Sequence, residues 1–121
     1  MEILALTLIV LRCSDIERSR DFYESLGLRF ASEKHGSGHA HYSTRIGSIV
    51  LELYPQTDAE TRGLRIGFSV VDLSATLQLV GHNGYSPTRV FWDALPPHAL
   101  IRDPDGHWIE LTQVREIVEP Q

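Results

Sequence analysis

The sequence predicts an α+β protein in which one β-α-β-β-β pattern occurs twice in tandem. Asp15 and Asp72 each follow an apolar run and open a helical pattern, and they lie 57 residues apart. The glycines that end these patterns, Gly27 and Gly84, are separated by the same distance. A chain of 121 residues is long enough for one core, whereas either half alone is short for a core of its own. We therefore expect one domain, with the two halves paired about a pseudo-twofold axis.

Each repeat closes on an apolar strand that carries a glutamate. Glu52 lies in the segment Ile-Val-Leu-Glu-Leu at 49–53, and Glu110 lies in His-Trp-Ile-Glu-Leu at 107–111. A buried carboxylate without a partner is costly, so each of these residues needs one. Two such glutamates at equivalent places suggest a site shared between the halves.

In the first half, branched aliphatic residues at 3–11 predict a strand that is buried on both faces. Ser14 and Glu17 have the spacing of a capping box, which starts a helix that Gly27 ends. Three further strands are expected at 28–33, 39–45 and 48–54, because the segments between them have turn composition.

In the second half, a strand at 64–71 precedes a helix that Asp72 caps and Gly84 ends. Further strands are expected at 86–92, 99–102 and 107–112. The Asp-Pro-Asp-Gly segment at 103–106 is a strong turn signal. The predicted organisation is module one at 1–54, a linker at 55–62, module two at 63–113 and a C-terminal tail at 114–121.

Composition excludes several classes of function. The net charge of −5 offers no basic face for nucleic acid or anionic lipid. The apolar start lacks the charged n-region and small-residue cleavage site of a signal peptide, and no run approaches the ~20 apolar residues of a membrane span. Cys13 is the single cysteine, which excludes an internal disulfide and fits a reducing compartment. We expect a cytoplasmic protein.

Two segments resemble the vicinal oxygen chelate superfamily, which includes glyoxalase I, bleomycin-resistance proteins and extradiol dioxygenases. Residues 15–27 are similar to its D-x-x-x-S-x-x-F-Y-x-x-L-G segment, and residues 103–111 to its D-P-D-G-x-x-x-E-L ending. The resemblance covers residues 1–113 and implies two modules that form a curled mixed sheet, with a central cleft and the helices outside. Relatives hold a divalent metal in that cleft, but the fold hosts many activities.

The resemblance places the four metal-ligand positions at Leu8, Glu52, Arg65 and Glu110. Leucine has no lone pair to give, and arginine is a permanent cation. We therefore expect no metal or other cofactor, and Arg65 paired with Glu52, Glu110 or both in a charge-assisted contact. Arg65 could instead anchor an anionic ligand or start a strand that faces solvent. Glu52 could bind a cationic or hydroxylated ligand, or be a remnant that Arg65 satisfies.

The histidines give weaker signals. His39 and His41 have a spacing that can chelate zinc, but no further ligand stands at matching spacing, which favours surface or hairpin residues. His98 could act as an acid or base in the cleft, although the sequence shows no orienting partner. His107 is expected at the edge of the turn.

Aromatic residues and the cysteine complete the candidates. Tyr42, Tyr54, Phe91 and Trp92 are candidate pocket walls, with core or dimer contacts as the alternative. Cys13 stands beside a helix N-terminus, which can activate a thiol, but a packing role is favoured.

These features favour a small-molecule-binding protein of the bleomycin-resistance type that has lost its metal. The resemblance further implies a homodimer whose chains share the clefts. The expected pocket residues are Leu8, Glu52, Arg65, Glu110, Tyr54, His98 and Trp92. The alternative is a lyase, isomerase or dioxygenase, metal-dependent or using Glu110 or His98 as base, which requires a histidine close to a glutamate. A third reading is a regulatory or assembly subunit with a closed cleft.

Overall fold

The computed structural model describes residues 2–57 and 59–114 and contains two four-stranded sheets, each with one helix. The first module comprises β1 (Leu8–Cys13), α1 (Ile16–Ser25), β2 (Ala31–Glu33), β3 (His41–Ile46) and β4 (Ile49–Pro55). The second comprises β5 (Arg65–Val70), α2 (Leu73–His82), β6 (Arg89–Phe91), β7 (His98–Arg102) and β8 (Trp108–Gln113). This element order confirms the predicted α+β fold of tandem βαβββ modules.

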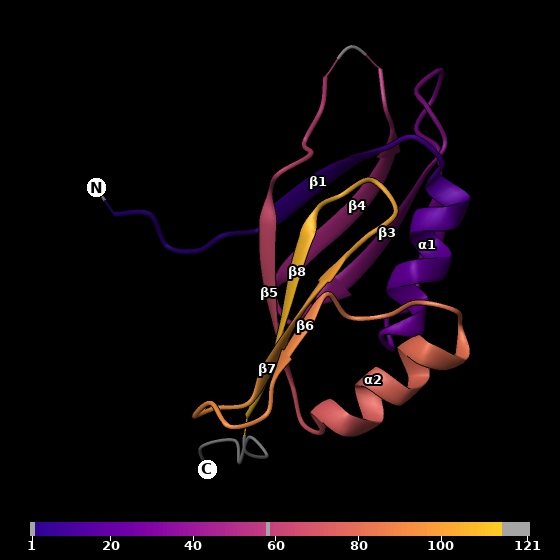
Figure 1. Ribbon diagram of the computed structural model, residues 1–121. Coiled ribbons are helices and arrows are strands. Elements are labelled where there is room, and N and C mark those ends of the chain that lie inside the picture. The colour runs from indigo at the N-terminus through magenta and orange to yellow at the C-terminus, as the bar shows by residue number, and fades with distance from the viewer. Residues whose placement is uncertain (1, 58, 115–121) are drawn as a thin grey trace.

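The two sheets have the same topology. Their strand orders are β1-β4-β3-β2 and β5-β8-β7-β6. In each sheet the first strand runs parallel to the last and the other pairs are antiparallel. Figure 1 shows the sheets side by side, with both helices on the same side of them. The predicted mixed sheet is therefore divided into two halves, one for each module.

Alternation along the strands separates a covered face from an open one. Leu11 and Leu53 of the first sheet and Ile66 and Leu111 of the second are buried on the helix side. From the helices, the same core receives Phe22, Tyr23, Leu73 and Val80. Residues at the alternate positions point the opposite way, because successive side chains of a strand face opposite sides. In the described part of the chain, that opposite face carries no helix, and Glu52, Arg65 and Glu110 lie on it.

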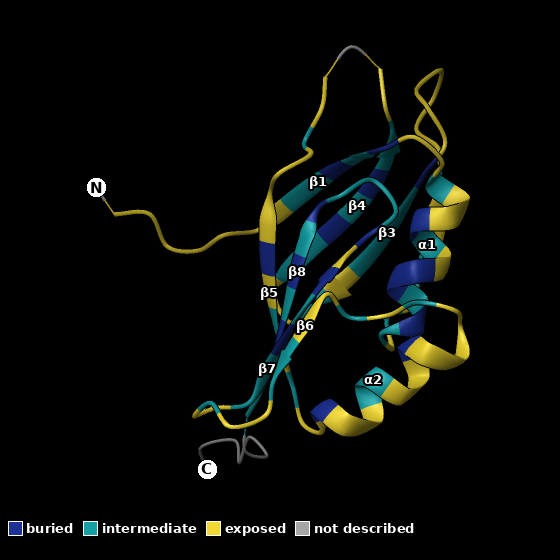
Figure 2. Cartoon of the chain, in the orientation of Figure 1, coloured by how far each residue is buried: buried dark blue, intermediate teal, exposed yellow. Residues whose placement is uncertain are grey.

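The predicted N-terminal strand at 3–11 is wrong in its bounds and burial. β1 begins at Leu8, which pairs with Val50, and beyond that pair only Ile49 of β4 remains to face the segment before it. Residues 2–7 are exposed (Figure 2), and the exposed fraction of Ile3 is 95%. β1 is buried on one face only, because Leu11 and Cys13 are buried whereas Leu8 is exposed. The predicted strands at 28–33 and 86–92 likewise begin three residues later, and the predicted tail lies outside the described residues from 115 onward.

The predicted capping box of α1 is also wrong. Asp15, rather than Ser14, is the N-cap, because its carboxylate accepts the backbone N–H groups of Glu17 and Arg18 at 3.0 and 3.3 Å. Glu17 accepts the Tyr42 hydroxyl at 2.6 Å instead of reaching back to the cap. The predicted Asp72 cap of α2 is confirmed, since Asp72 accepts the Ala75 N–H at 3.1 Å.

The Asp-Pro-Asp-Gly turn of the second module fastens the first module to it. Asp105 accepts the Ser14 backbone N–H at 2.9 Å and the Ser19 hydroxyl at 3.3 Å. Asp103 accepts the buried Tyr23 hydroxyl at 2.6 Å. These contacts reach β1 and α1 from the far end of the chain, so they fix how the two modules sit together.

His107 lies at the edge of the turn, as predicted, because its backbone pairs with that of Asp103, and it extends this network from a buried position. Its side chain is fully buried, with Nδ1 2.6 Å from Asp103 Oδ2 and Nε2 2.6 Å from Thr61 Oγ1. A carboxylate only accepts, so the ring proton lies on Nδ1 and Nε2 accepts the Thr61 hydroxyl. Thr61 in turn accepts the Arg12 backbone N–H at 3.0 Å. The ring is buried because it joins the linker to the turn.

Candidate functional site

The open face of the second sheet carries Arg65 and Glu110, two of the four family ligand positions. Arg65 Nη2 donates to Glu110 Oε1 at 2.5 Å. Of the two predicted partners of Arg65, Glu52 and Glu110, the structure pairs it with Glu110. Gly67 lies opposite Glu110 in the register, and a Cβ built at this glycine would be 3.9 Å from Glu110 Oε2. Glu110 therefore extends across β5 toward Arg65. Arg65 also starts β5 with a side chain that is 57% exposed, as the solvent-facing reading expects.

Glu52 has a different partner. His41 Nε2 lies 3.4 Å from Glu52 Oε2, and the residue His41 is only 1% exposed. The imidazole stacks on the Tyr54 ring, with centroids 4.2 Å apart and planes at 10°. Of the two favoured readings, surface or hairpin histidine, the second holds for His41, which begins β3 of the hairpin but is buried beneath Tyr54. This contact also meets the requirement, set by the enzyme hypothesis, for a histidine close to a glutamate.

Leu8 and Arg65 line an apolar groove between β1 and β5. The groove has a volume of about 570 Å³ and is lined by Leu6, Leu8, Ile9, Ile46, Ile49, Leu51, Leu64, Arg65, Ile66, Gly67 and Phe68. Leu8 is 50% exposed to it and to solvent. Of the predicted pocket residues, Leu8 and Arg65 are brought together here. Glu52 and Glu110 lie on the open faces of separate sheets, each with its own partner.

These four side chains do not fit the metal that relatives hold at the same positions. A divalent ion needs lone pairs, and Leu8 supplies none. Arg65 already occupies Glu110 with a cationic group, which repels a second cation. At positions 8 and 65 the chain therefore offers no ligand to a divalent ion.

Stacked aromatic and cationic groups recur on both open faces. Arg12 lies over the Tyr54 ring at 5.4 Å, and Arg102 lies over Trp108 at 4.1 Å. Trp108 was missed by sequence reasoning, although its position two residues before Glu110 places it on the same face of β8. Such flat, partly exposed surfaces suit stacking of an aromatic ligand.

The remaining aromatic candidates differ in their surroundings. Phe91 stacks on His98 with centroids 4.6 Å apart, and His98 Nδ1 lies 3.0 Å from the Pro96 carbonyl oxygen. That carbonyl is an orienting partner that sequence reasoning did not find. Trp92 is 52% exposed. Tyr42 faces α1, where it accepts a hydrogen bond from Arg20 at 2.8 Å, so its assignment as a pocket wall is wrong.

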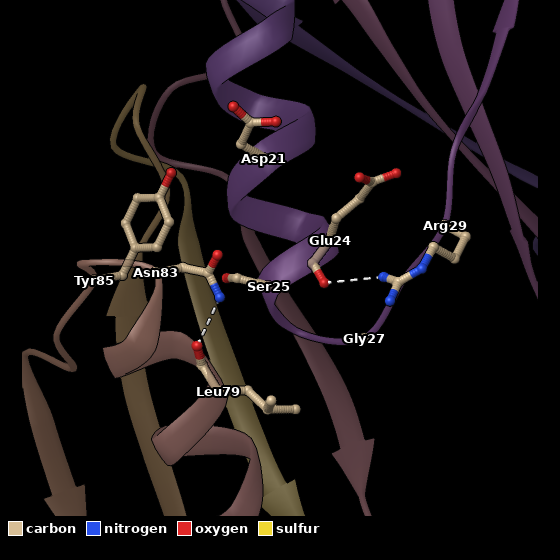
Figure 3. Close-up of a pocket in the computed structure, with 8 residues that line it drawn as sticks. All are labelled: Asp21, Glu24, Ser25, Gly27, Arg29, Leu79, Asn83 and Tyr85. Atoms are coloured by element: carbon tan, nitrogen blue, oxygen red, sulfur yellow. Dashed lines mark hydrogen bonds between the residues drawn. The ribbon is translucent and has the colours of Figure 1, made fainter.

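A second cavity, of about 490 Å³, lies between α1 and α2 (Figure 3). Its lining is polar, but these polar groups already bind neighbouring backbone. Arg29 donates to the Glu24 carbonyl oxygen at 3.2 Å, and Asn83 donates to that of Leu79 at 2.9 Å. The cavity is therefore a weaker candidate than the groove.

Cys13 is a packing residue, as favoured from the sequence. It is fully buried, and burial raises the pKa of its thiol to about 12 despite a hydrogen bond with Ser19. A thiol with this pKa is protonated at neutral pH and is not a nucleophile.

The fold and the four family ligand positions indicate the class of protein to which the chain belongs. The family model described as Glyoxalase/Bleomycin resistance protein/Dioxygenase superfamily matches residues 5–111, and the chain belongs to this family. No curated protein matches the chain in sequence. Neither helix of the described chain is long and apolar enough to cross a membrane.

Solved structures of similar fold have varied descriptions. An integron cassette protein from V. cholerae is 24% identical, with a TM-score of 0.71 over 93% of this chain and 97% of its own. TnmS3, an antibiotic binding protein from Streptomyces sp. CB03234, is 24% identical, with a TM-score of 0.72 over 93% and 98%. The oxidase ChaP-H2 is 17% identical, with a TM-score of 0.73 over 93% and 95%. At these identities the likeness concerns the fold alone.

Proposed function

We propose that this chain is a small-molecule-binding protein of the glyoxalase/bleomycin-resistance type whose family metal centre is replaced by a binding pocket. The observation that carries the proposal is the groove between β1 and β5. It presents Leu8 and Arg65 at two positions where relatives have metal ligands, and Arg65 is already paired with Glu110. An apolar wall beside an ion pair can bind a ligand by burial and hydrogen bonding without a metal.

The lining indicates the chemistry of the ligand. Apolar side chains dominate the groove, so the body of the ligand is expected to be apolar. Trp108, which lies opposite Arg65 in the register, offers an aromatic face beside the groove, and Glu110 can accept hydrogen bonds. An aromatic molecule with cationic or hydroxyl groups meets all of these requirements. TnmS3 is described as an antibiotic binding protein, and this description agrees with the proposed ligand class.

We further propose that the protein works as a cytoplasmic homodimer. The open faces and the exposed apolar residues Ile3, Leu4 and Leu6 are surfaces that a second copy would cover. A partner on these faces would enclose the groove and shield the ligand from water. The buried, reduced Cys13 is compatible with a reducing compartment.

The test is ligand binding by EDTA-treated protein without an affinity tag. Calorimetry and thermal shift should be measured with metal-free bleomycin and a panel of polycyclic aromatic antibiotics. We expect at least one compound to raise the melting temperature, because a ligand that binds the native state stabilises it. Leu8→Asp, which charges the groove wall, should lose this binding. Arg62→Gln removes an exposed ion pair outside the groove and is the matched control. Equal binding by wild type and Leu8→Asp would reject the proposal.

A metal-independent enzyme remains the second candidate, and the His41–Glu52 contact favours it. A histidine held by a carboxylate can transfer protons in a reaction. Isomerisation of a hemithioacetal by EDTA-treated wild type, which needs only proton transfer, would establish this function if it is lost in Glu52→Gln. Equal rates in the two proteins would exclude a role of Glu52. The third reading, a subunit with a closed cleft, fits poorly with a groove of about 570 Å³.

A further inference from the structure

Three potential metal ligands gather at the β2–β3 hairpin, away from the family positions. Glu33 ends β2, His35 lies in the turn and His41 begins β3 directly opposite Glu33 in the register. One ligand atom from each residue lies within 4.8 Å of the others. Glu33 Oε2 and His35 Nε2 are 3.2 Å apart, and the rings of His35 and His41 are 5.3 Å apart. The hairpin therefore brings two imidazoles and a carboxylate to one point.

The surroundings of His41 indicate that a cation belongs beside it. The ring is almost fully buried, and both of its nitrogens face acceptors. Nδ1 lies 3.2 Å from the His39 carbonyl oxygen, and Nε2 lies 3.4 Å from Glu52 Oε2. A neutral imidazole has only one N–H to donate, so one nitrogen meets an acceptor with its lone pair. Among the described residues, the Tyr54 hydroxyl, also 3.4 Å from Nε2, can offer that nitrogen a proton. A cation at Nε2 would remove this conflict.

One interatomic distance already matches that between two ligands of a coordinated ion. Zinc bonds of ~2.0–2.1 Å in a tetrahedron place neighbouring ligand atoms about 3.3 Å apart. Glu33 Oε2 and His35 Nε2 are separated by 3.2 Å, and a ring nitrogen of His41 lies within 4.8 Å of the ligand atoms of both residues. The carbonyl of His39 would hold the Nδ1 proton of His41, as backbone carbonyls do for metal-bound histidines.

The three ligands differ in how the fold holds them. Glu33 and His41 are paired with each other across β2 and β3. His35 lies in the turn between these strands, where its side chain is exposed and Gly36 follows it with a φ of +59°. His35 is therefore the accessible ligand of the site.

We propose that Glu33, His35 and His41 bind a divalent transition-metal ion of the zinc type. Two imidazoles and a carboxylate suit zinc, cobalt or nickel, whereas magnesium and calcium prefer oxygen ligands alone. The site is confined to the first module, since β2 and β3 lie on the side of the sheet away from β1. The ion would fasten the hairpin to the sheet next to Tyr54. This site is independent of the groove and does not require the proposed function.

Cobalt and zinc titrations of untagged, EDTA-stripped protein test this proposal. We expect one ion per chain by calorimetry, and the intense visible bands of tetrahedral cobalt. Zinc should raise the melting temperature of wild type. His35→Ala should weaken zinc binding at least ~10-fold, a loss typical even of outer-shell changes at metal sites. His39→Ala changes an exposed histidine of the same hairpin and should leave zinc affinity unchanged.

Two results would overturn the site. Equal zinc affinity in wild type and His35→Ala would show that any bound ion lies elsewhere. A cobalt complex without tetrahedral bands would show that these residues do not gather around an ion. Circular dichroism checks that His35→Ala is folded, and Glu33→Gln serves as a second variant with the same expected loss. Small-molecule binding in EDTA is measured separately, so failure of either proposal leaves the other standing.

Discussion

Replacing Asp103 with asparagine should destabilise the protein strongly, because this carboxylate joins the two modules. Its Oδ2 accepts the Tyr23 hydroxyl and the His107 Nδ1–H, both at 2.6 Å. Its Oδ1 accepts the backbone N–H groups of Asp105 and His107 at 3.0 and 2.9 Å. An asparagine keeps one acceptor oxygen and presents an NH₂ group to the other pair of donors.

The expected cost follows from the two hydrogen bonds that Asp103→Asn loses. Hydrogen bonds to a charged group contribute about 1.5–3 kcal/mol each, so the free energy of unfolding should fall by about 3–6 kcal/mol. Urea denaturation followed by circular dichroism measures this difference. Tyr23→Phe, which removes one of the bonds, should cost roughly half as much. Asp93→Asn changes an exposed aspartate and is the control. A change of less than ~0.5 kcal/mol for Asp103→Asn, the range of ordinary surface substitutions, would refute the reasoning.

Three further predictions concern the same framework. Burial alone raises the pKa of Asp103, but hydrogen bonds from His107 and Tyr23 outweigh it and leave the pKa below 3.8. The carboxylate therefore stabilises the protein above pH 3.8, and this stabilisation is lost as the pH falls through the folded-state pKa. Urea denaturation should show that the free energy of unfolding falls more steeply between about pH 5 and about pH 2 for wild type than for Asp103→Asn. Native Cys13, with its pKa of about 12, should resist a thiol reagent at about pH 8, where an ordinary cysteine is reactive, until denaturant exposes it; rapid native labelling would contradict its burial. Because Asp15 is the N-cap of α1, Asp15→Ala should lower the free energy of unfolding by about 1 kcal/mol in thermal unfolding, and Ser14→Ala should lower it by less. A larger loss for Ser14→Ala would support Ser14 as the cap instead.

The fold could be predicted from the sequence because its signals are local and occur twice. Asp72 and the two helix-ending glycines have side-chain or backbone properties that favour one conformation, and Gly27 and Gly84 have φ values of 107° and 85°. The same repeat placed Glu52 and Glu110 on equivalent strands. The bounds of the strands were harder to predict. The first residue of β1, for example, depends on where β4 begins, 41 residues further along the chain.

The partners of the site residues could not be predicted, because they are set by contacts between distant segments. Glu52 meets His41 only through the register of β3 and β4. His107 is buried because Thr61 of the linker reaches it, which nothing beside either residue in the sequence indicates. Glu33 and His35 join His41 through the hairpin, so the weak His39–His41 spacing pointed to the right segment with the wrong partner.

The metal content of untagged His35→Ala protein tests the central claim, which is that the family metal centre is replaced in this chain. This variant lacks one ligand of the hairpin site, so a remaining ion that is lost in Glu110→Gln would lie at the family positions. With Leu8 unable to coordinate and Glu110 held by Arg65, inductively coupled plasma analysis should find far less than one transition-metal ion per chain. About one ion per chain, lost in Glu110→Gln, would contradict the account.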